Sequence, residues 1–138
     1  MPASFPLVRK SSNQGYIPNP IVPIQLLTQS GYVLFHFLVD TGSDFSLIPA
    51  VFAGSFGFDT SKMKSKEIRG LNQASVRMYV AKVTIKITHK PIEIRCGFTE
   101  GQSSLAPGTP FILGTIDIFD KYNIHFDNKA KLIHFIDI

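Results

Sequence analysis

The sequence lacks several features that mark common classes of protein. Tryptophan is absent, there is a single cysteine, and only 17% of the residues are charged whereas 44% are hydrophobic. One cysteine cannot form a disulfide within the chain, which excludes a disulfide-stapled fold and favours a reduced, cytoplasmic setting. The low charge and the 12 phenylalanines exclude an intrinsically disordered chain.

Long apolar segments are also missing. No apolar run approaches the roughly 20 residues that cross a bilayer, and residues 1–14 have no apolar core of the length found in signal peptides. We therefore expect no membrane association and no export. A chain of 138 residues suits one hydrophobic core. We predict an N-terminal arm over 1–20, with 1–15 irregular or an edge strand of a partner, and one domain over 21–138.

The excess of basic residues does not form a binding stripe. The net charge is +4, and ten of the 14 basic residues are lysines scattered along the chain. The densest group comprises Lys62, Lys64, Lys66 and Arg69, while the aromatic residues fall inside apolar runs elsewhere. A nucleic-acid-binding surface usually combines a basic stripe with stacking aromatics. We interpret this group as a solvated face and expect no nucleic-acid partner.

Short alternating segments indicate strands rather than helices. Glycine- or asparagine-containing turns at 29–32, 71–74 and 127–130 predict three hairpins, and short helices are expected at 49–56 and 115–121. A surface loop is expected over 99–110. This spacing predicts an all-β barrel or sandwich. The expected strands lie at 24–28, 33–39, 67–70, 76–88, 91–98, 111–114, 122–126 and 131–138.

Most of the remaining reactive side chains have unremarkable interpretations. Cys96 lies in a strand-like segment and is expected to be a small packed side chain. No glycine-rich phosphate loop is present. No ligand spacing known for metal sites occurs among the candidates His125, Asp127, His134 and Asp137, so neither a metal nor an organic cofactor is expected.

Asp40 is the strongest candidate for chemistry. It follows the apolar segment 37–39, so its carboxyl group emerges from a core rather than from a solvated face. Such a carboxylate needs compensating hydrogen bonds or charges. Thr41 offers a hydroxyl group, and Gly42 lets another backbone approach closely because it has no Cβ. The alternative is an ordinary strand-ending turn, since Asp and Gly both favour turns.

Two segments resemble hallmarks of a known family. Phe37-Leu38-Val39-Asp40-Thr41-Gly42-Ser43 resembles the active-site signature of aspartic proteases, and Phe111-Ile112-Leu113-Gly114 resembles their second hallmark. The spacing, the hairpin between the two segments and the chain length resemble the retropepsins, which are retroviral and retroviral-like aspartic proteases. The resemblance covers 21–136. It implies an all-β, closed retropepsin-like acid-protease barrel with a flap hairpin and one or two short helices.

The resemblance also implies a function. Retropepsins are aspartic endopeptidases that act as homodimers on polypeptide substrates. In such a dimer two Asp40 carboxyl groups would meet, one taking a proton from water while the other donates one to the peptide carbonyl oxygen. A two-fold axis would supply the second Asp40 from an identical chain. Residues 132–136, near the C-terminus, are expected to supply part of the dimer sheet.

The resemblance assigns roles residue by residue. Asp40, Thr41 and Gly42 would be catalytic, with Thr41 hydrogen-bonding across the dimer axis and Gly42 letting the substrate backbone lie near the carboxyl groups. Ser43 is expected to donate a hydrogen bond to the Asp40 carboxylate. Residues 69–73 would form the flap tip. The implied substrate-binding residues are Ser43, Asp44, Arg69, Gly70, Leu71, Ile112, Leu113 and Gly114.

The sequence departs from the retropepsin pattern in two places. The flap tip at 69–74 contains less glycine than retroviral flaps. Thr115 stands where many retroviral relatives have an arginine, so Asp44 lacks its usual partner. Three alternatives stay open: an inactive lobe of the same fold, a module that binds an extended peptide as an added strand, and a partner lobe for a different chain.

Overall fold

The structure is a computed structural model that describes residues 2–69, 75–100 and 111–138. These residues form strands and two short 3-10 helices, and none of their helices has the length and hydropathy needed to cross a bilayer. The elements are β1 (Ala3–Pro6), β2 (Val8–Ser12), β3 (Gly15–Asn19), β4 (Ile21–Thr28), β5 (Gly31–Val39), β6 (Ser46–Pro49), η1 (Ala50–Phe56), η2 (Thr60–Lys62), β7 (Lys66–Arg69), β8 (Ser75–Lys86), β9 (Pro91–Glu100), β10 (Phe111–Leu113), β11 (Tyr122–Asp127) and β12 (Leu132–Asp137).

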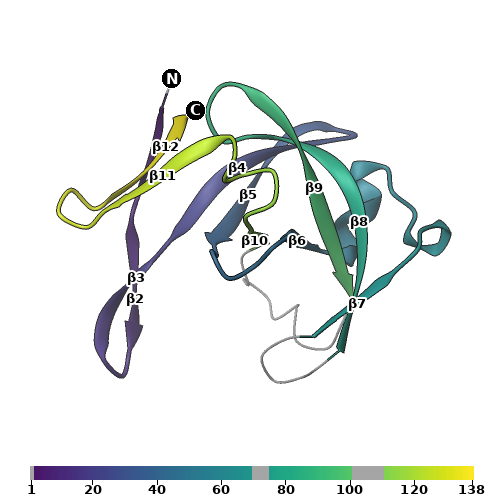
Figure 1. The fold of residues 1–138 in the computed structure, drawn as a ribbon, viewed down its shortest axis with the longest axis horizontal. Coiled ribbons are helices and arrows are strands. Elements are labelled where there is room, and N and C mark those ends of the chain that lie inside the picture. The colour runs from purple at the N-terminus through teal and green to yellow at the C-terminus, as the bar shows by residue number, and fades with distance from the viewer. Residues whose placement is uncertain (1, 70–74, 101–110) are drawn as a thin grey trace.

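Six of the described strands close into a barrel (Figure 1). Their order is β4-β5-β10-β6-β9-β8, and β8 returns to β4 through the pairs Gln25↔Lys86 and Leu26↔Ile85. β7 pairs with the outer part of β8 and lies outside the ring. Closure satisfies the backbone groups that an open sheet would leave unpaired at its edges. The prediction of an all-β barrel is confirmed.

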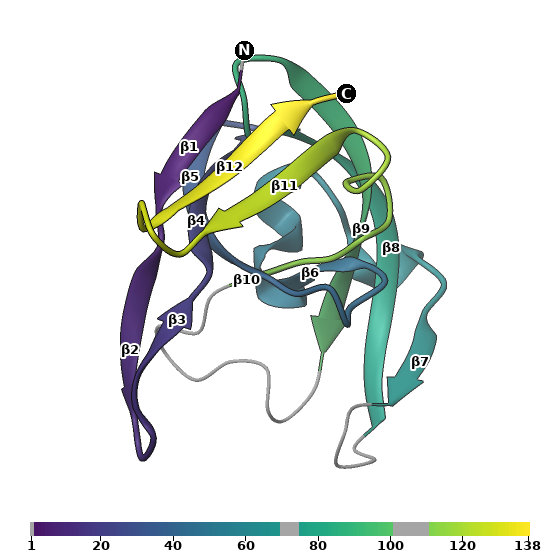
Figure 2. The same cartoon turned by 60° about the vertical axis from the view of Figure 1, so that its left-hand side comes forward.

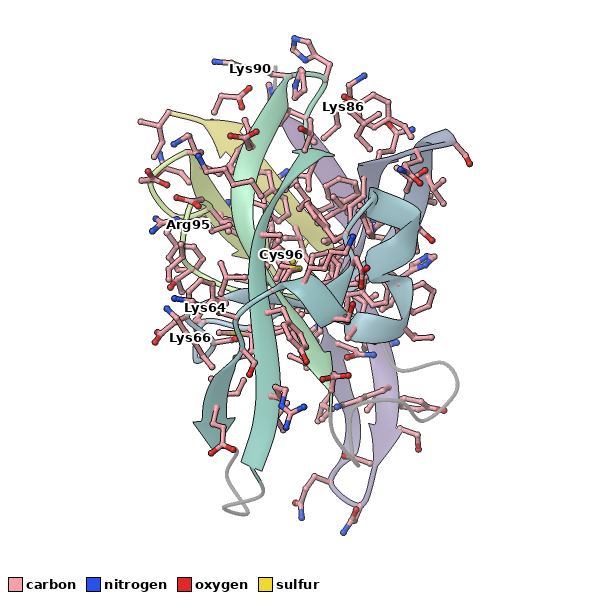
Figure 3. The ribbon with its side chains drawn as sticks, turned by 90° about the vertical axis from the view of Figure 1, so that its right-hand side faces the viewer. Lys64, Lys66, Lys86, Lys90, Arg95 and Cys96 are labelled. Carbon is pink, nitrogen blue, oxygen red and sulfur yellow. The ribbon has the colours of Figure 1, made fainter. Side chains whose placement is uncertain are left out.

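The alternation seen in the sequence places successive side chains on opposite sides of each strand. Figure 3 shows this for β9, where Cys96 lies inside the barrel and Arg95 lies on the outside. Cys96 is 0% exposed, which confirms the expectation of a small packed side chain. Burial disfavours the thiolate, so the pKa of the Cys96 thiol is raised well above its usual value.

The N-terminal residues form strands, which differs from the expectation. β1 pairs with β12 of its own chain, and β2 and β3 form a separate hairpin that projects from the body beyond the barrel (Figure 2). The hairpin turns at Gly15, whose φ of 91° is costly for other residues. The Ser12 hydroxyl also donates to the Gly15 carbonyl oxygen at 2.7 Å. The expectation of an irregular arm over 1–15 was therefore wrong, whereas the alternative of an edge strand of a partner and the division at residue 20 stay predictions.

The expected hairpins and the first short helix are present. β4 and β5 form the first hairpin, β7 and β8 the second, and β11 and β12 the third. η1 begins after Pro49 and ends at Phe56, and Gly57 caps it in the left-handed conformation with a φ of 85°. The second hairpin is the predicted flap, and its tip at 70–74 lies outside the described residues. Of the loop expected over 99–110, residues 99–100 belong to β9 instead, and residues 101–110 lie outside the described part of the chain.

The short helix expected at 115–121 is replaced by consecutive turns. Asp117 interrupts it with a φ of 65° in the left-handed region. Its carboxylate accepts hydrogen bonds from the backbone N–H of Arg95 at 2.8 Å and from two guanidinium nitrogens of Arg95 at 3.0 Å. These bonds lower the pKa of Asp117 to about 2. A contact between residues 22 positions apart thus overrides the local helical preference.

Candidate active site

The two segments singled out in the sequence lie side by side. β10 pairs in parallel with β5, and the register places Phe111 beside Phe37 and Leu113 beside Val39. The Asp40 N–H continues this ladder by donating to the Leu113 carbonyl oxygen at 3.0 Å. Asp40 therefore leaves the barrel beside the end of β10.

The chain turns sharply after Asp40 and holds the carboxylate in one orientation. The Gly42 N–H donates to Asp40 Oδ1 at 2.9 Å, and the Ser43 N–H donates to the Asp40 carbonyl oxygen at 3.2 Å. Asp40 is half-buried, whereas Thr41 and Gly42 are exposed. The turn, residues 40–43, therefore presents a fixed carboxylate at the surface.

Gly114 packs against the backbone of the segment that follows this turn, so closely that only a residue without a Cβ fits. A Cβ at position 114 would lie 2.5 Å from the Phe45 carbonyl carbon and 2.7 Å from the Ser43 carbonyl oxygen. The Thr115 N–H donates to the same Ser43 oxygen at 3.0 Å. The Ile116 N–H donates to the Asp44 carbonyl oxygen at 2.8 Å. Residues 114–116 therefore interlock with the segment that follows Asp40.

Ser46 completes this support and was missed from the sequence. Its side chain is 0% exposed, and its hydroxyl oxygen accepts a hydrogen bond from the Gly114 N–H at 3.0 Å. The Cys96 thiol in turn donates to the Ser46 carbonyl oxygen at 3.3 Å. The available signal was a hydroxyl residue at the start of an apolar strand, where a buried hydroxyl needs a partner.

Comparisons with protein-family models and with curated proteins found no match. Among solved structures, the chain is similar to a retropepsin-like aspartic protease from Rickettsia conorii, with a TM-score of 0.63, 16% sequence identity, and coverage of 98% of this chain and 91% of that one. The chain has a retropepsin-like fold. It is also similar to EIAV protease complexed with the inhibitor HBY-793, with a TM-score of 0.52, 21% identity, and coverage of 70% and 81% respectively.

Within this retropepsin-like fold, Ser43 differs from its expected arrangement. A hydroxyl group has one hydrogen to donate, and the Ser43 hydroxyl donates it to the Phe45 carbonyl oxygen at 2.7 Å. The expected bond from Ser43 to the Asp40 carboxylate is therefore not formed, and Gly42 supplies a donor to that carboxylate instead. The Ser43 side chain stabilises the turn locally because the backbone brings Phe45 within its reach.

The other expected substrate-binding residues divide into three groups. Leu113 is 1% exposed and Gly114 is buried, so both face the core and hold the turn, whereas Ile112 is partly exposed. Asp44 is exposed beside the turn. Arg69 ends β7, far along the flap hairpin, and Gly70 and Leu71 lie outside the described residues.

The base of the flap is tied to the barrel by a contact that the sequence did not indicate. The Tyr79 hydroxyl donates to Glu100 Oε1 at 2.6 Å, and the guanidinium of Arg77 lies 3.8 Å from the same oxygen. These bonds link β8 to the end of β9 where the flap leaves the barrel. They restrain the flap hairpin at its root.

A hollow of about 260 Å³ opens beside the Asp40 turn. Val39 and Thr41, which flank Asp40, form one wall, and residues of β11 and the turn before it form the other. Phe119 and Phe126 on that second wall are 43% and 39% exposed. The surface next to the carboxylate is therefore apolar as well as recessed.

Of the residues considered for metal binding, His125, Asp127 and His134 lie on one face of the sheet formed by β1, β12 and β11, whereas Asp137 lies opposite Tyr122 on the other face. His125 and His134 are cross-strand neighbours with ring centroids 5.6 Å apart, and Ser4 Oγ lies 2.7 Å from Nδ1 of His134. Among the residues that the structure describes, no group of three or more His, Cys, Asp or Glu side chains is arranged to hold a metal ion.

Proposed function

We propose that the chain is an aspartic endopeptidase that acts as a homodimer, in which two Asp40 carboxyl groups activate a water molecule. The observation that carries this proposal is the Asp40 turn. Gly114 packs against one side of this turn and the Thr115 N–H donates to it, while Thr41 and Gly42 on the turn are exposed. Preorganised groups of this kind lower a reaction barrier because no reorganisation is needed when charge develops.

Hydrolysis of a peptide bond by this route needs two carboxyl groups in different protonation states. The ionised one takes a proton from water, and the protonated one donates to the carbonyl oxygen of the substrate. Two carboxyl groups at hydrogen-bonding distance share one proton because both cannot easily ionise together. One chain contributes a single Asp40, so a two-fold axis beside the turn would supply the other.

The neighbouring residues have proposed roles in this arrangement. Thr41 is exposed and would contact the same turn of the second chain. Gly42 is also exposed, and its lack of a side chain would let a substrate backbone approach the carboxyl groups. Gly114 and Ser46 act through the backbone and would position the turn without touching the substrate. The flap hairpin would close over a bound polypeptide and exclude water.

A peptide-library digest compares the wild type with Asp40→Asn at acid and neutral pH. Removal of the general acid and base should lower the cleavage rate by at least about 100-fold. Asp120→Asn is the matched control, because it removes an exposed carboxylate that contacts Lys121 and lies outside the proposed site. Its rate should match the wild type.

The same digest separates the alternatives. Cleavage that persists in Asp40→Asn would refute the assigned role of Asp40. If neither protein cleaves any peptide but both bind extended peptides, the chain is a binding module. The homodimer would be refuted if the enzyme is diluted until it sediments as a monomer and its specific cleavage rate does not fall.

A further inference from the structure

Two histidines face each other on the sheet formed by β1, β12 and β11. His125 on β11 is directly opposite His134 on β12, so their side chains extend from the same face of the sheet. The three strands lie side by side in Figure 2. The two residues are nine positions apart in the sequence, a spacing that matches no common metal-ligand motif. The pair is therefore a product of the β11–β12 hairpin and could not be recognised from spacing.

The separation of the two rings fits a shared metal ion. The ring centroids of His125 and His134 lie 5.6 Å apart. Zinc binds imidazole nitrogen at about 2.0–2.1 Å, so each ring centre would be about 3.2 Å from the ion, and at a tetrahedral angle the two ring centres would be about 5.2 Å apart. A small rotation of one side chain closes the difference. His125 is exposed and His134 is half-buried, so an ion can reach the pair from solvent.

Ser4 supplies the outer hydrogen bond that metal-binding histidines commonly have. It lies directly opposite His134 on β1, and its Oγ is 2.7 Å from Nδ1 of that ring. In the tautomer that donates a proton from Nδ1 to the Ser4 hydroxyl oxygen, the lone pair of Nε2 is free for a metal ion. An outer bond of this kind fixes the orientation of the ring and raises its basicity as a ligand.

A carboxylate lies on the same face beside the pair. Asp127 is two residues after His125 on β11. Its Oδ1 accepts the Ala130 N–H at 2.8 Å, and this bond, with smaller contributions from the two histidines, lowers the pKa of Asp127. The carboxylate therefore stays ionised at neutral pH, and its negative charge favours a cation at the pair.

We propose that His125 and His134 bind one divalent transition-metal ion between β11 and β12. Imidazole nitrogen suits Cu²⁺, Ni²⁺ and Zn²⁺, whereas Mg²⁺ and Ca²⁺ prefer oxygen ligands. Within residues 2–69, 75–100 and 111–138, no group of three or more ligand side chains is arranged around an ion, so water would complete the coordination. Because the other face of β11 lines the hollow beside the Asp40 turn, the ion would stabilise one wall of that hollow.

Calorimetric titration of the full chain with Zn²⁺ and with Cu²⁺ near neutral pH tests this proposal. The wild type should bind one ion per chain, with Cu²⁺ bound more tightly than Zn²⁺ and no binding of Mg²⁺. His125→Ala and His134→Ala should each raise the dissociation constant by at least about 100-fold, because the remaining ligand loses the gain from chelation. Binding should weaken as the pH falls, since protons compete with the ion for imidazole.

His36→Ala is the matched control for the two histidine variants. His36 is exposed on β5, and its cross-strand neighbour on β4 is Pro23, which offers no ligand. The dissociation constant of this variant should equal that of the wild type. Ser4→Ala should raise the dissociation constant by about 10-fold because the outer hydrogen bond is lost, whereas Ser4→Thr keeps the hydroxyl group and should bind as the wild type does.

The electron paramagnetic resonance spectrum of bound Cu²⁺ gives a readout that needs no variant. The wild type loaded with one Cu²⁺ per chain should show coupling to two imidazole nitrogens. Thermal unfolding gives a second readout, because an ion stabilises only the folded form that binds it. Added Zn²⁺ should therefore raise the melting temperature of the wild type and of His36→Ala, and leave that of His134→Ala unchanged.

Several results would overturn the metal site. They are coupling of Cu²⁺ to a single nitrogen, a dissociation constant unchanged in His125→Ala, an equal loss of affinity in His36→Ala, and no binding at millimolar Zn²⁺ or Cu²⁺. None of these measurements depends on peptide cleavage, so the metal site can fail while the proposed protease activity holds, and the reverse.

Discussion

Gly114→Ala is the most direct test of how the Asp40 turn is held. The added Cβ would lie 2.5 Å from the Phe45 carbonyl carbon and 2.7 Å from the Ser43 carbonyl oxygen, and both are backbone atoms that cannot rotate away. Overpacking of this kind costs about 1–3 kcal/mol. To relieve this clash, residues 114–116 must move away from residues 43–45. The movement stretches the hydrogen bond from the Thr115 N–H to the Ser43 carbonyl oxygen, which lowers the free energy of unfolding by about 1 kcal/mol more.

The total, about 3 kcal/mol, is measurable by urea unfolding. With a denaturant slope of about 1–3 kcal/mol per molar, typical of small domains, the midpoint should fall by roughly 1–3 M. Peptide cleavage should fall by about 100-fold if the turn is displaced by about 1 Å, because catalysis depends on placement at that scale.

Gly54→Ala is the matched control for this prediction. A Cβ at position 54 would meet no atom within 4 Å, so its stability should stay within about 0.5 kcal/mol of the wild type. If Gly114→Ala unfolds at the same urea concentration as Gly54→Ala, the close approach of 114 to the turn is not what holds Asp40.

Two further predictions follow from the environments of Asp117 and Cys96. The pKa of Asp117 is lowered from 3.8 to about 2 by Arg95, so its contribution to stability is present above about pH 4 and is lost as the pH falls toward 2. The melting temperature of Asp117→Asn should therefore be lower than that of the wild type at pH 6 and converge with it near pH 2; parallel curves would contradict this. Burial raises the pKa of the Cys96 thiol, so a thiol reagent should modify Cys96 only as fast as the protein unfolds, and rapid labelling of the native protein would contradict the buried position.

The sequence was sufficient for features that depend on neighbouring residues. Alternation within 33–39 and 91–98 indicated strands, because a strand exposes every second side chain to the same environment. The segment 37–43 and the segment 111–114 indicated the candidate site, and the packed position of Cys96 followed from its apolar surroundings. Each inference needed only a few consecutive residues.

Contacts between distant residues lay beyond such local patterns. The bond from Ser43 to Phe45 spans only two residues, but it forms in a turn against which Gly114, far along the chain, packs closely. Asp117 adopts a left-handed conformation in which its carboxylate accepts hydrogen bonds from Arg95. Ser46 could be recognised as a support of the turn only when its hydroxyl was seen to accept the Gly114 N–H.

By itself, the sequence indicated β4, β5 and the strands from β7 to β12, the candidate carboxylate and the resemblance to retropepsins, but not β1, β2, β3 or β6. The tertiary structure alone decided which strands pair, that β8 closes the barrel on β4, and that β12 has a strand on both sides whereas β11, among the residues described, has one on a single side. The physical reason is that side-chain periodicity reports the environment of one strand, whereas pairing depends on backbone hydrogen bonds between segments far apart in the chain.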